Sequence, residues 1–390
     1  MQSDTVEGLH YQTGQPVRVY MANGRIASVA PVADCDETSL WLGPGLVDLQ
    51  VNGFAGHDAN ATAPDPRNIA ILTAALWAQG VTRYLPTLVT TCASHLQMAL
   101  RSIVAAMDEN EQVAQSVLGI HLEGPFISPE DGPRGAHDAA WVRAPDWDLF
   151  QSWQDVAGGR IRIITLSPEW DGAPAFIQRC AATGVRVAIG HTAATPEQIR
   201  EAVTSGATLS THLGNGTHAT LPRHPNYLWE QLASEALWTS FIGDGFHLPA
   251  AVMKVILKVK QQRAFLVSDT VALAGLPAGR YDAAVGGSVV LTPDGRLCLE
   301  RDPGLLAGSA QPLLRAVERL SAQGICEFAQ AWDLASVRPT NYLQPGAPAG
   351  LSPGSPADLI MFERQSDGIR IVSTLVNGTR VYDWKAQRRS

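Results

Sequence analysis

The chain has 390 residues, of which 45% are hydrophobic and 17% are charged, a composition typical of globular proteins rather than disordered or membrane-embedded ones. Its formal net charge of −8 disfavours nucleic acid and anionic membranes as the main partner, but it does not exclude an anionic small molecule. The length fits one large α/β domain with a smaller companion.

The first forty residues read as short strands joined by a tight turn. Residues 17–20 and 25–30 are rich in apolar side chains, and Asn23-Gly24 lies between them. This dipeptide adopts positive φ angles at low cost and is a strong signal for a β-hairpin. We therefore expect the N-terminal segment to contribute strands to a small β domain.

The middle of the chain alternates short buried-type strands with segments of helical length. Eight apolar runs carry the strand signal, at 46–51, 81–89, 117–122, 161–165, 185–190, 207–211, 238–243 and 264–268. Helical patterns lie between most of them, for example at 66–79, 93–107, 196–205 and 249–261, where Pro196 and Pro249 suit first-turn positions. Eight alternations over roughly 270 residues match a (β/α)8 barrel. A doubly wound open sheet is the alternative, but no GxGxxG turn follows the first strand.

The C-terminal segment returns to the pattern of the first forty residues. Turns that contain glycine separate three apolar runs, at 359–362, 369–376 and 379–382. The expected fold is therefore α/β, with a (β/α)8 TIM-like barrel at 45–344 and a small β-sandwich domain built from both termini, 1–44 and 345–390.

Reactive polar side chains follow the predicted strands of the barrel. Glu123 follows the third strand, while His191 and His212 follow the fifth and the sixth. His247 comes after the seventh strand and Asp269 after the eighth. Because the carboxyl ends of barrel strands converge on one mouth, we expect these side chains to lie together. A carboxylate with two imidazoles is a common ligand set for catalytic zinc or iron.

Each of these residues also has a structural interpretation. Glu123 could be a buried acid that accepts backbone hydrogen bonds, and His191 or His212 could be a core histidine. Asp269 could cap the N-terminus of a helix. The joint placement of all four at strand ends favours a metal site, although each residue alone is ambiguous. The sequence leaves the roles of four other histidines open, His57, His121, His218 and His224.

Five cysteines are scattered without a CxxC pair, at Cys35, Cys92, Cys180, Cys298 and Cys326. This odd number argues against a disulfide framework or a thiolate metal site and suits a reducing cytoplasm. The first ten residues contain neither a basic region nor an apolar run, so we expect no signal peptide. The sequence contains no run of about 18 apolar residues, so we expect no membrane-spanning helix. We therefore expect a cytoplasmic protein without a membrane or nucleic-acid partner.

Short motifs occur in a fixed order along the barrel: GPGLVDLQVNG at 43–53, HLEGPF at 121–126, RGAH at 134–137, GHT at 190–192, THL at 211–213, DGFH at 244–247, SD at 268–269 and LAGS at 306–309. With these motifs, and GSPAD at 354–358, the sequence resembles the N-acetylglucosamine-6-phosphate deacetylase family of the amidohydrolase superfamily. The combination is specific, whereas no single motif is.

The resemblance implies a role for each matching residue. Glu123, His191 and His212 would bind one divalent metal ion, with zinc as the first candidate and iron as the alternative. Asp269 would be the catalytic acid and base. Substrate contacts would come from Ala136, His137, Asn215, Gly216, Arg223, His247, Leu306, Ala307 and Gly308.

The sequence departs from the superfamily and from the family at two places. Many amidohydrolases carry an HxH pair on the first strand for a second metal, but Gln50 and Asn52 stand there, as in the family's single-metal branch. The usual THL-[YF]-N-A-M is replaced by THLGNGT at 211–217. In relatives the arginine matching Arg223 binds the substrate phosphate across a dimer interface, and here its flanking sequence has changed. The expected homodimer rests on the resemblance alone.

The implied activity is metal-dependent removal of the N-acetyl group from an N-acetylated amino sugar. N-acetylglucosamine 6-phosphate is the foremost candidate substrate, giving the amino sugar phosphate and acetate. Another N-acyl substrate, such as an N-acyl amino acid or an unphosphorylated amino sugar, and a non-catalytic sugar-binding role remain alternatives. A carboxylated lysine marks many cyclic amidases of the superfamily, but no lysine precedes Lys254. Glu123 fills that role, which favours the deacetylase branch.

Overall fold

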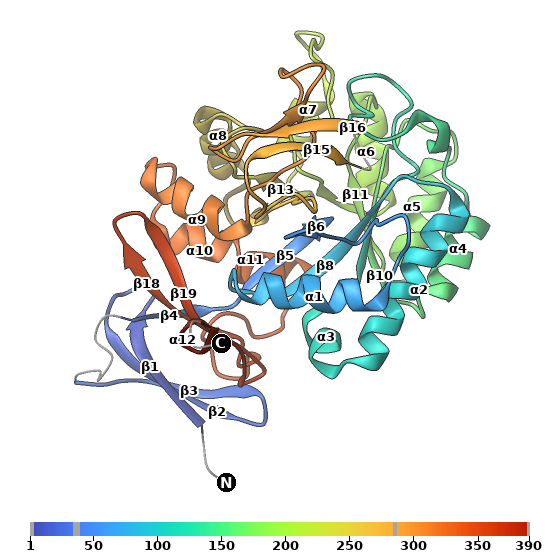
Figure 1. The fold of residues 1–390 in the computed structure, drawn as a ribbon. Helices are drawn as coiled ribbons and strands as arrows, with labels where there is room; N and C mark the ends of the chain where they lie inside the picture. The colour runs from blue at the N-terminus through green and yellow to red at the C-terminus, as the bar shows by residue number, and fades with distance from the viewer. Residues whose placement is uncertain (1–3, 34–39, 284–286, 388–390) are drawn as a thin grey trace.

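A computed structural model describes residues 4–33, 40–283 and 287–387, and its centre is a parallel barrel surrounded by helices (Figure 1). The barrel strands lie in the spatial order β14-β13-β12-β11-β10-β9-β8-β5. Their bounds are β5 (Leu46–Val51), β8 (Val81–Val89), β9 (Ile120–Glu123), β10 (Ile161–Leu166), β11 (Arg186–Ile189), β12 (Ala207–Ser210), β13 (Trp238–Ile242) and β14 (Ala264–Val267). The predicted (β/α)8 barrel is confirmed.

Backbone hydrogen bonds at the carboxyl ends of β5 and β14 close the barrel between its first and last strands. Asn52 N donates to Thr270 O over 2.9 Å, and Asp269 N donates to Gln50 O over 3.0 Å. The residues that follow β5 and β14 therefore share one rim, although they are far apart in the sequence.

Apolar side chains fill the interior of the barrel. The buried cluster consists of Val47, Leu49, Leu85, Ile163, Ala188, Leu209, Ile242, Phe265, Val267 and Tyr342. Tyr342 belongs to helix α11 (Val337–Leu343), and its ring centroid lies 5.4 Å from that of Phe265 and 5.6 Å from that of Trp238. Aromatic packing therefore fills the interior of the barrel at its amino-terminal end.

Helices cover the outside of the barrel, and α6 (Pro196–Ser205) shows how their starts are specified. Thr195 Oγ1 accepts from Gln198 N, Gln198 Oε1 accepts from Thr195 N, and Pro196 occupies the first turn. Pro249, which was expected inside a helix, precedes α8 in an extended conformation. The remaining helices are α1 (Pro66–Trp77), α2 (Ala93–Glu109), α3 (Glu111–Ser116), α4 (Trp147–Val156), α5 (Ala173–Ala182), α7 (Tyr227–Ala233), α8 (Ala250–Lys260), α9 (Leu313–Ala322), α10 (Phe328–Leu334) and α12 (Trp384–Gln387).

Both ends of the chain meet in one seven-stranded sheet, which confirms the predicted β-sandwich companion of the barrel. Its strand order is β20-β19-β18-β4-β1-β2-β3, so β4 joins the N-terminal strands to the C-terminal ones. Asn23 and Asn377 turn two hairpins with φ angles of 52° and 47°. The strands are β1 (Asp4–His10), β2 (Pro16–Ala22), β3 (Arg25–Pro31), β4 (Trp41–Pro44), β18 (Leu359–Gln365), β19 (Gly368–Val376) and β20 (Thr379–Asp383).

Two β elements at the mouth of the barrel lie outside the predicted pattern. One is a hairpin of β6 (Gly53–Phe54) and β7 (His57–Asp58), and the other is the three-stranded insert of β15 (Gly279–Ala283), β16 (Gly287–Leu291) and β17 (Leu297–Leu299). The insert follows β14 and lies over the mouth (Figure 1).

Two further findings bear on the environment of the chain. In the described ranges, no helix is both long and apolar enough to pass through a membrane. Four cysteines there are free thiols, whereas Cys35 lies outside the described residues.

Candidate functional site

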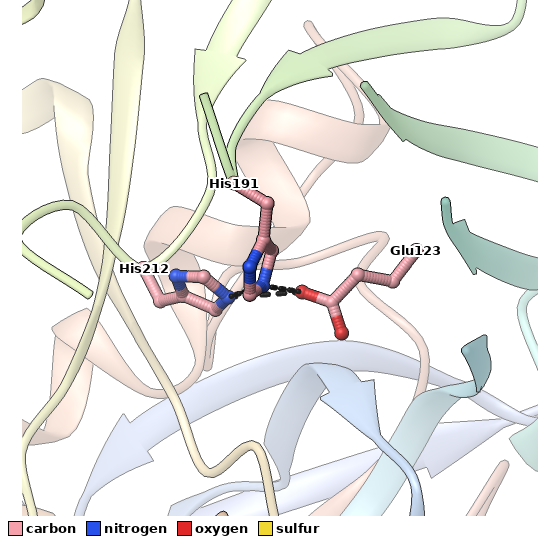
Figure 2. Close-up of side chains that lie close together, drawn as sticks. All are labelled: Glu123, His191 and His212. Carbon is pink, nitrogen blue, oxygen red and sulfur yellow. Dashed lines mark hydrogen bonds and ion pairs between the residues drawn. The ribbon is translucent and has the colours of Figure 1, made fainter. Parts of the chain in front are cut away.

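Three side chains from separate strand ends converge at the mouth of the barrel (Figure 2). Glu123 ends β9, while His191 and His212 lie just beyond β11 and β12. Glu123 Oε1 lies 2.9 Å from His212 Nε2 and 3.3 Å from His191 Nε2, and the two imidazole nitrogens are 3.2 Å apart. All three residues are buried, and their potential ligand atoms lie within 4.8 Å of one another. Such a cluster is compact enough to surround a single ion.

Neighbouring groups orient these side chains. His191 Nδ1 donates to Pro133 O over 2.9 Å, which leaves the lone pair of Nε2 for the cluster. Gln50 Nε2 donates to Glu123 Oε1 over 2.8 Å. Gly216 has a φ of 57° and packs against the His191 ring, where a Cβ would lie 2.6 Å from Nδ1. The protein itself therefore fixes the orientation of the cluster.

The electrostatics favour an ionised carboxylate beside the imidazoles. Burial alone would raise the pKa of Glu123, but hydrogen bonds from His191 and His212 hold it well below its usual range. Burial would lower the pKa of His212, yet its hydrogen bond to Glu123 raises it. His212 Nδ1 is buried and has no hydrogen-bond partner in the described part of the chain. A carboxylate oxygen and two imidazole nitrogens this close together fit a divalent metal ion.

The backbone is strained where these side chains leave their strands. His191, His212 and Asp269 have φ angles of 49°, 28° and 50°, values that residues other than glycine rarely adopt. Each such conformation costs on the order of 1–3 kcal/mol. Strain of this kind clusters at functional sites, and here it occurs at three neighbouring strand ends.

Asp269 lies beside the cluster and has a perturbed carboxyl group. Asn52 Nδ2 donates to Asp269 Oδ1 over 2.8 Å. Burial, together with the negative charge of Glu123, raises the pKa of Asp269 to about 6. A carboxyl group with a pKa near neutrality can both accept and return a proton.

A cavity of about 450 Å³ contains the cluster and Asp269 in its wall. Eight of the nine predicted substrate contacts also line it, namely Ala136, His137, Asn215, Gly216, His247, Leu306, Ala307 and Gly308. The ninth, Arg223, is exposed on the loop before α7 and does not line the cavity. A role for Arg223 at this cavity therefore requires a second copy of the chain or movement of the loop.

Two histidines of the cavity wall have fixed partners. His137 Nδ1 lies 2.9 Å from Thr90 Oγ1, and burial and the neighbouring His191 lower the pKa of His137 to about 3, so its ring is neutral. His247 Nδ1 lies 2.7 Å from Asp244 Oδ2. Burial would raise the pKa of Asp244, but its hydrogen bond with His247 lowers it. This carboxylate orients the His247 ring and leaves Nε2 as the atom it can offer a ligand.

The four histidines without an assigned role lie outside the metal cluster and do not line the cavity. His121 is buried in the barrel, where its Nε2 lies 2.8 Å from Thr165 Oγ1. His57 and His218 contact neighbouring polar side chains, and His224 is exposed. The structure therefore places none of the four in the wall of this cavity.

Sequence reasoning missed several cavity residues. It treated Asn52 only as a poor metal ligand, yet this residue holds Asp269. Because Asn52 comes two residues after Gln50, both side chains point to the same side, and that spacing was an available signal. Asp282 and Leu305 also line the cavity. Asp282 belongs to β15 of the three-stranded insert and Leu305 follows β17, and the sequence reasoning predicted no element in this region.

Comparisons with known proteins point to one family. No family model matches the chain. The chain is 31% identical to the N-acetylglucosamine-6-phosphate deacetylase of Bos taurus, over 96% of this chain and 90% of that protein. It is 30% identical to the N-acetylgalactosamine-6-phosphate deacetylase of Escherichia coli O157:H7, over 92% of this chain and 93% of that protein.

A solved structure gives the same result. A mutant N-acetyl-D-glucosamine-6-phosphate deacetylase from Mycobacterium smegmatis, in complex with N-acetyl-D-glucosamine-6-phosphate, aligns with a TM-score of 0.85 and 26% identity. The alignment covers 98% of this chain and 100% of that chain. The barrel, the site at its mouth and these relatives agree, and the chain belongs to the N-acetylglucosamine-6-phosphate deacetylase family.

Proposed function

We propose that this protein hydrolyses the N-acetyl group of an N-acetylated amino sugar in a metal-dependent reaction that releases acetate. The observation that carries the proposal is a single cavity whose wall holds Glu123, His191 and His212 together with Asp269. The names of the relatives support it, since they specify the 6-phosphates of N-acetylglucosamine and N-acetylgalactosamine. N-acetylglucosamine 6-phosphate is therefore the first substrate to assay.

Glu123, His191 and His212 would hold one divalent ion, with zinc as the first candidate. One carboxylate oxygen and two imidazole nitrogens suit zinc and also ferrous iron. Gln50 and Asn52 stand where a second site would need ligands, and their amides bond to Glu123 and Asp269 instead. When bound, such an ion lowers the pKa of a water molecule from about 15.7 to about 7 and polarises the amide carbonyl.

Asp269 would handle the protons of the reaction. Its carboxylate accepts a proton from the attacking water as the C–O bond forms, and returns it to the amide nitrogen as the C–N bond breaks. Asn52 Nδ2 donates a hydrogen bond of 2.8 Å to Oδ1 of Asp269, so the other carboxylate oxygen is left to accept the proton. A pKa of about 6 leaves Asp269 mostly ionised at neutral pH, as a general base must be.

Other cavity residues would orient the substrate. His137 Nδ1 lies 2.9 Å from Thr90 Oγ1, and in the tautomer that carries its hydrogen on Nε2 this neutral ring would donate to the carbonyl oxygen. His247 and Asn215 would contact sugar hydroxyls, because holding the amide close to the water offsets much of the entropic cost. The other proposed contacts are Ala136, Gly216, Leu306, Ala307 and Gly308.

The assembly we propose is a homodimer. Trp229 of α7 is 55% exposed, and Val252, Val255 and Val259 of the adjacent helix α8 are exposed and follow one helical face. Contiguous exposed apolar side chains of this kind often mark protein contacts. Arg223 lies just before α7, so a dimer built on this face would bring Arg223 to the interface.

We place the protein in the cytoplasm. The four cysteines within the described ranges are free thiols, and a reducing compartment keeps thiols in that state.

The proposed function is tested by measuring acetate release from N-acetylglucosamine, N-acetylgalactosamine and their 6-phosphates, with the metal content of the same sample determined. We expect turnover of at least one of these sugars, its loss on chelation and its recovery on adding zinc. A metal-loaded protein that releases acetate from none of them would overturn the proposal. Release from N-acetyl amino acids alone would favour that alternative substrate class.

A further inference from the structure

Glu169 joins three loops at the mouth of the barrel. It lies three residues beyond the end of β10 and does not line the cavity. Its Oε1 accepts from Ser128 Oγ over 2.8 Å, and its Oε2 accepts from Ser167 Oγ over 2.6 Å. The backbone N–H of Ala193 also donates to Oε2, over 2.7 Å. These bonds fix the orientation of the carboxylate and connect the loops that follow β9, β10 and β11.

The place of Glu169 in the barrel explains this reach. β10 lies between β9 and β11 in the strand order, so a side chain just beyond β10 can contact the loops on both sides. One of these loops follows the proposed ligand Glu123, and the other contains the proposed ligand His191. Trp170 Nε1 donates to Ile127 O over 2.9 Å and ties the loops after β9 and β10 together at a second point.

The bond to Ala193 bears directly on the position of His191. Ala193 lies two residues after His191, whose φ angle of 49° is costly unless surrounding contacts hold it. Between them, Thr192 Oγ1 lies 2.8 Å from Ser167 Oγ, so the side chain of Thr192 is held as well. The carboxylate oxygen that accepts from the Ala193 N–H therefore helps to keep the His191 segment in its strained conformation.

The bond to Ser128 ties the facing loop to the same carboxylate. The Ser128 backbone N–H donates to His191 O over 2.8 Å. On the same loop, Pro133 O accepts from His191 Nδ1 over 2.9 Å. This loop thus holds both the main chain and the ring of His191, while Glu169 holds the loop and the His191 segment to each other.

We propose that Glu169 is a positioning residue that sets the place of His191 Nε2 in the metal cluster by accepting from the Ala193 N–H. This inference rests on the metal site of the proposed function and adds a residue outside the cavity wall. Substitution of groups that support metal ligands commonly changes metal affinity by about 10–100-fold. The reach of the side chain carries the effect rather than its charge, because the Ala193 N–H needs an acceptor at hydrogen-bond distance.

Two conservative substitutions separate reach from charge. Glu169→Gln removes the charge, but its amide oxygen can still accept from the Ala193 N–H and its amide nitrogen can donate to Ser128 Oγ. Glu169→Asp keeps the charge, but its side chain is shorter by a methylene group and withdraws from Ala193. We expect the zinc dissociation constant to rise about tenfold or more in Glu169→Asp and less than about threefold in Glu169→Gln. Competition with a chelator of known affinity measures it on the full chain.

Glu130→Asp is the matched control. Glu130 ends a Ser-Pro-Glu sequence at 128–130, as Glu169 does at 167–169, but its side chain is 59% exposed and its Oε2 lies 3.0 Å from His218 Nε2. The same shortening there should leave zinc affinity at the level of the unmodified protein. Because the affinities are measured without substrate, they decide the role of Glu169 even if no sugar is deacetylated.

The visible absorption of the cobalt-loaded protein gives a second measurement, because it reports the arrangement of the metal ligands rather than the stability of the fold. We expect the spectrum to change in Glu169→Asp and to stay the same in Glu169→Gln and Glu130→Asp. Equal zinc affinity in all three variants, or weaker binding by Glu169→Gln than by Glu169→Asp, would overturn the inference. A lower melting temperature of Glu169→Asp with unchanged affinity and spectrum would show a purely structural role and overturn it as well.

Discussion

The carboxyl and amino ends of the barrel are held together by different interactions. At the carboxyl ends of the strands, buried charged side chains are crowded together, and three residues have positive φ angles. At the amino ends, Tyr342 closes the barrel with aromatic contacts, and Arg83 forms an ion pair with Asp358 that ties the barrel to the terminal sheet. The comparison indicates that the residues of the site lie at the carboxyl ends of the strands, while contacts that stabilise the fold lie at the amino ends. Substitutions at the carboxyl ends should therefore change turnover, and those at the amino ends should change the free energy of unfolding.

The largest effect is expected from Asp269→Asn. Asparagine keeps the shape of the side chain and tolerates the positive φ at this position, but it cannot act as a general base. We expect kcat to fall by about three orders of magnitude, since general acid–base catalysis contributes about 10²–10⁴-fold. Acetate release gives kcat, while metal content and melting temperature should stay close to those of the unmodified protein. A kcat within tenfold of the original would rule out this role for Asp269.

Loss of a metal ligand is expected to act through metal content. His212→Gln removes an imidazole whose Nε2 lies 2.9 Å from Glu123 Oε1, and we expect metal affinity to drop by more than about 100-fold, with activity lost in parallel. His218→Gln is the matched control, because His218 follows closely on the same loop but does not line the cavity. Elemental analysis after dialysis measures the difference. Equal metal content in the two variants would contradict the proposed ligand set.

The pH dependence of kcat/KM follows from the raised pKa of Asp269. Because the base must be ionised, kcat/KM should fall about tenfold per pH unit below about pH 6 and be level above it. A bound cation favours the ionised carboxyl group, so the acid limb of the metal-loaded enzyme should lie no higher than this. A pH–rate profile from pH 4.5 to 8 locates the limb. A limb above pH 7 would mean that a different group titrates.

The smallest effect on activity is expected at the opposite end of the barrel. Arg83 and Asp358, whose side chains are 14% and 11% exposed, pair over 2.5 Å. Asp358→Asn leaves the guanidinium without its counter-charge, so we expect the free energy of unfolding to fall by about 2–4 kcal/mol. Turnover by the folded protein should stay within twofold. Chemical denaturation measures the loss.

A surface ion pair serves as the control for that measurement. Glu197 and Arg200 are 72% and 54% exposed, so Glu197→Gln should leave the free energy of unfolding almost unchanged. If both variants lost the same stability, the ion pair at the amino end of the barrel would have no special structural role.

Much of the barrel could be predicted because each strand is a short apolar run followed by polar residues, a signal that depends only on local sequence. The exact residues at which each strand begins and ends could not be predicted in the same way. The third strand begins at Ile120 rather than at 117, since Gly119 has a φ of 147°. A Cβ on Gly119 would lie 2.2 Å from Arg162 Cγ, a contact made across the fold that local sequence does not reveal.

The site was predictable for a related reason, and only in part. Residues directly after strands reach one rim by the geometry of a barrel, so Glu123, His191 and His212 could be grouped before their distances were known. Asp282 in β15 and Leu305 after β17 reach the cavity through tertiary packing of a region where the sequence predicted no element. The strain at the rim residues is likewise visible only in backbone angles.

The position of β4 in the terminal sheet has a consequence for protein synthesis. β4 pairs with β1 on one side and with β18 on the other, where Pro44 lies opposite Leu359. A ribosome therefore releases β1 to β4 long before β18 exists to cover the open edge of β4. Unpaired edges of this kind invite pairing between nascent chains. A chain shortened before Leu359 would keep that edge permanently open, so we expect such a fragment to aggregate.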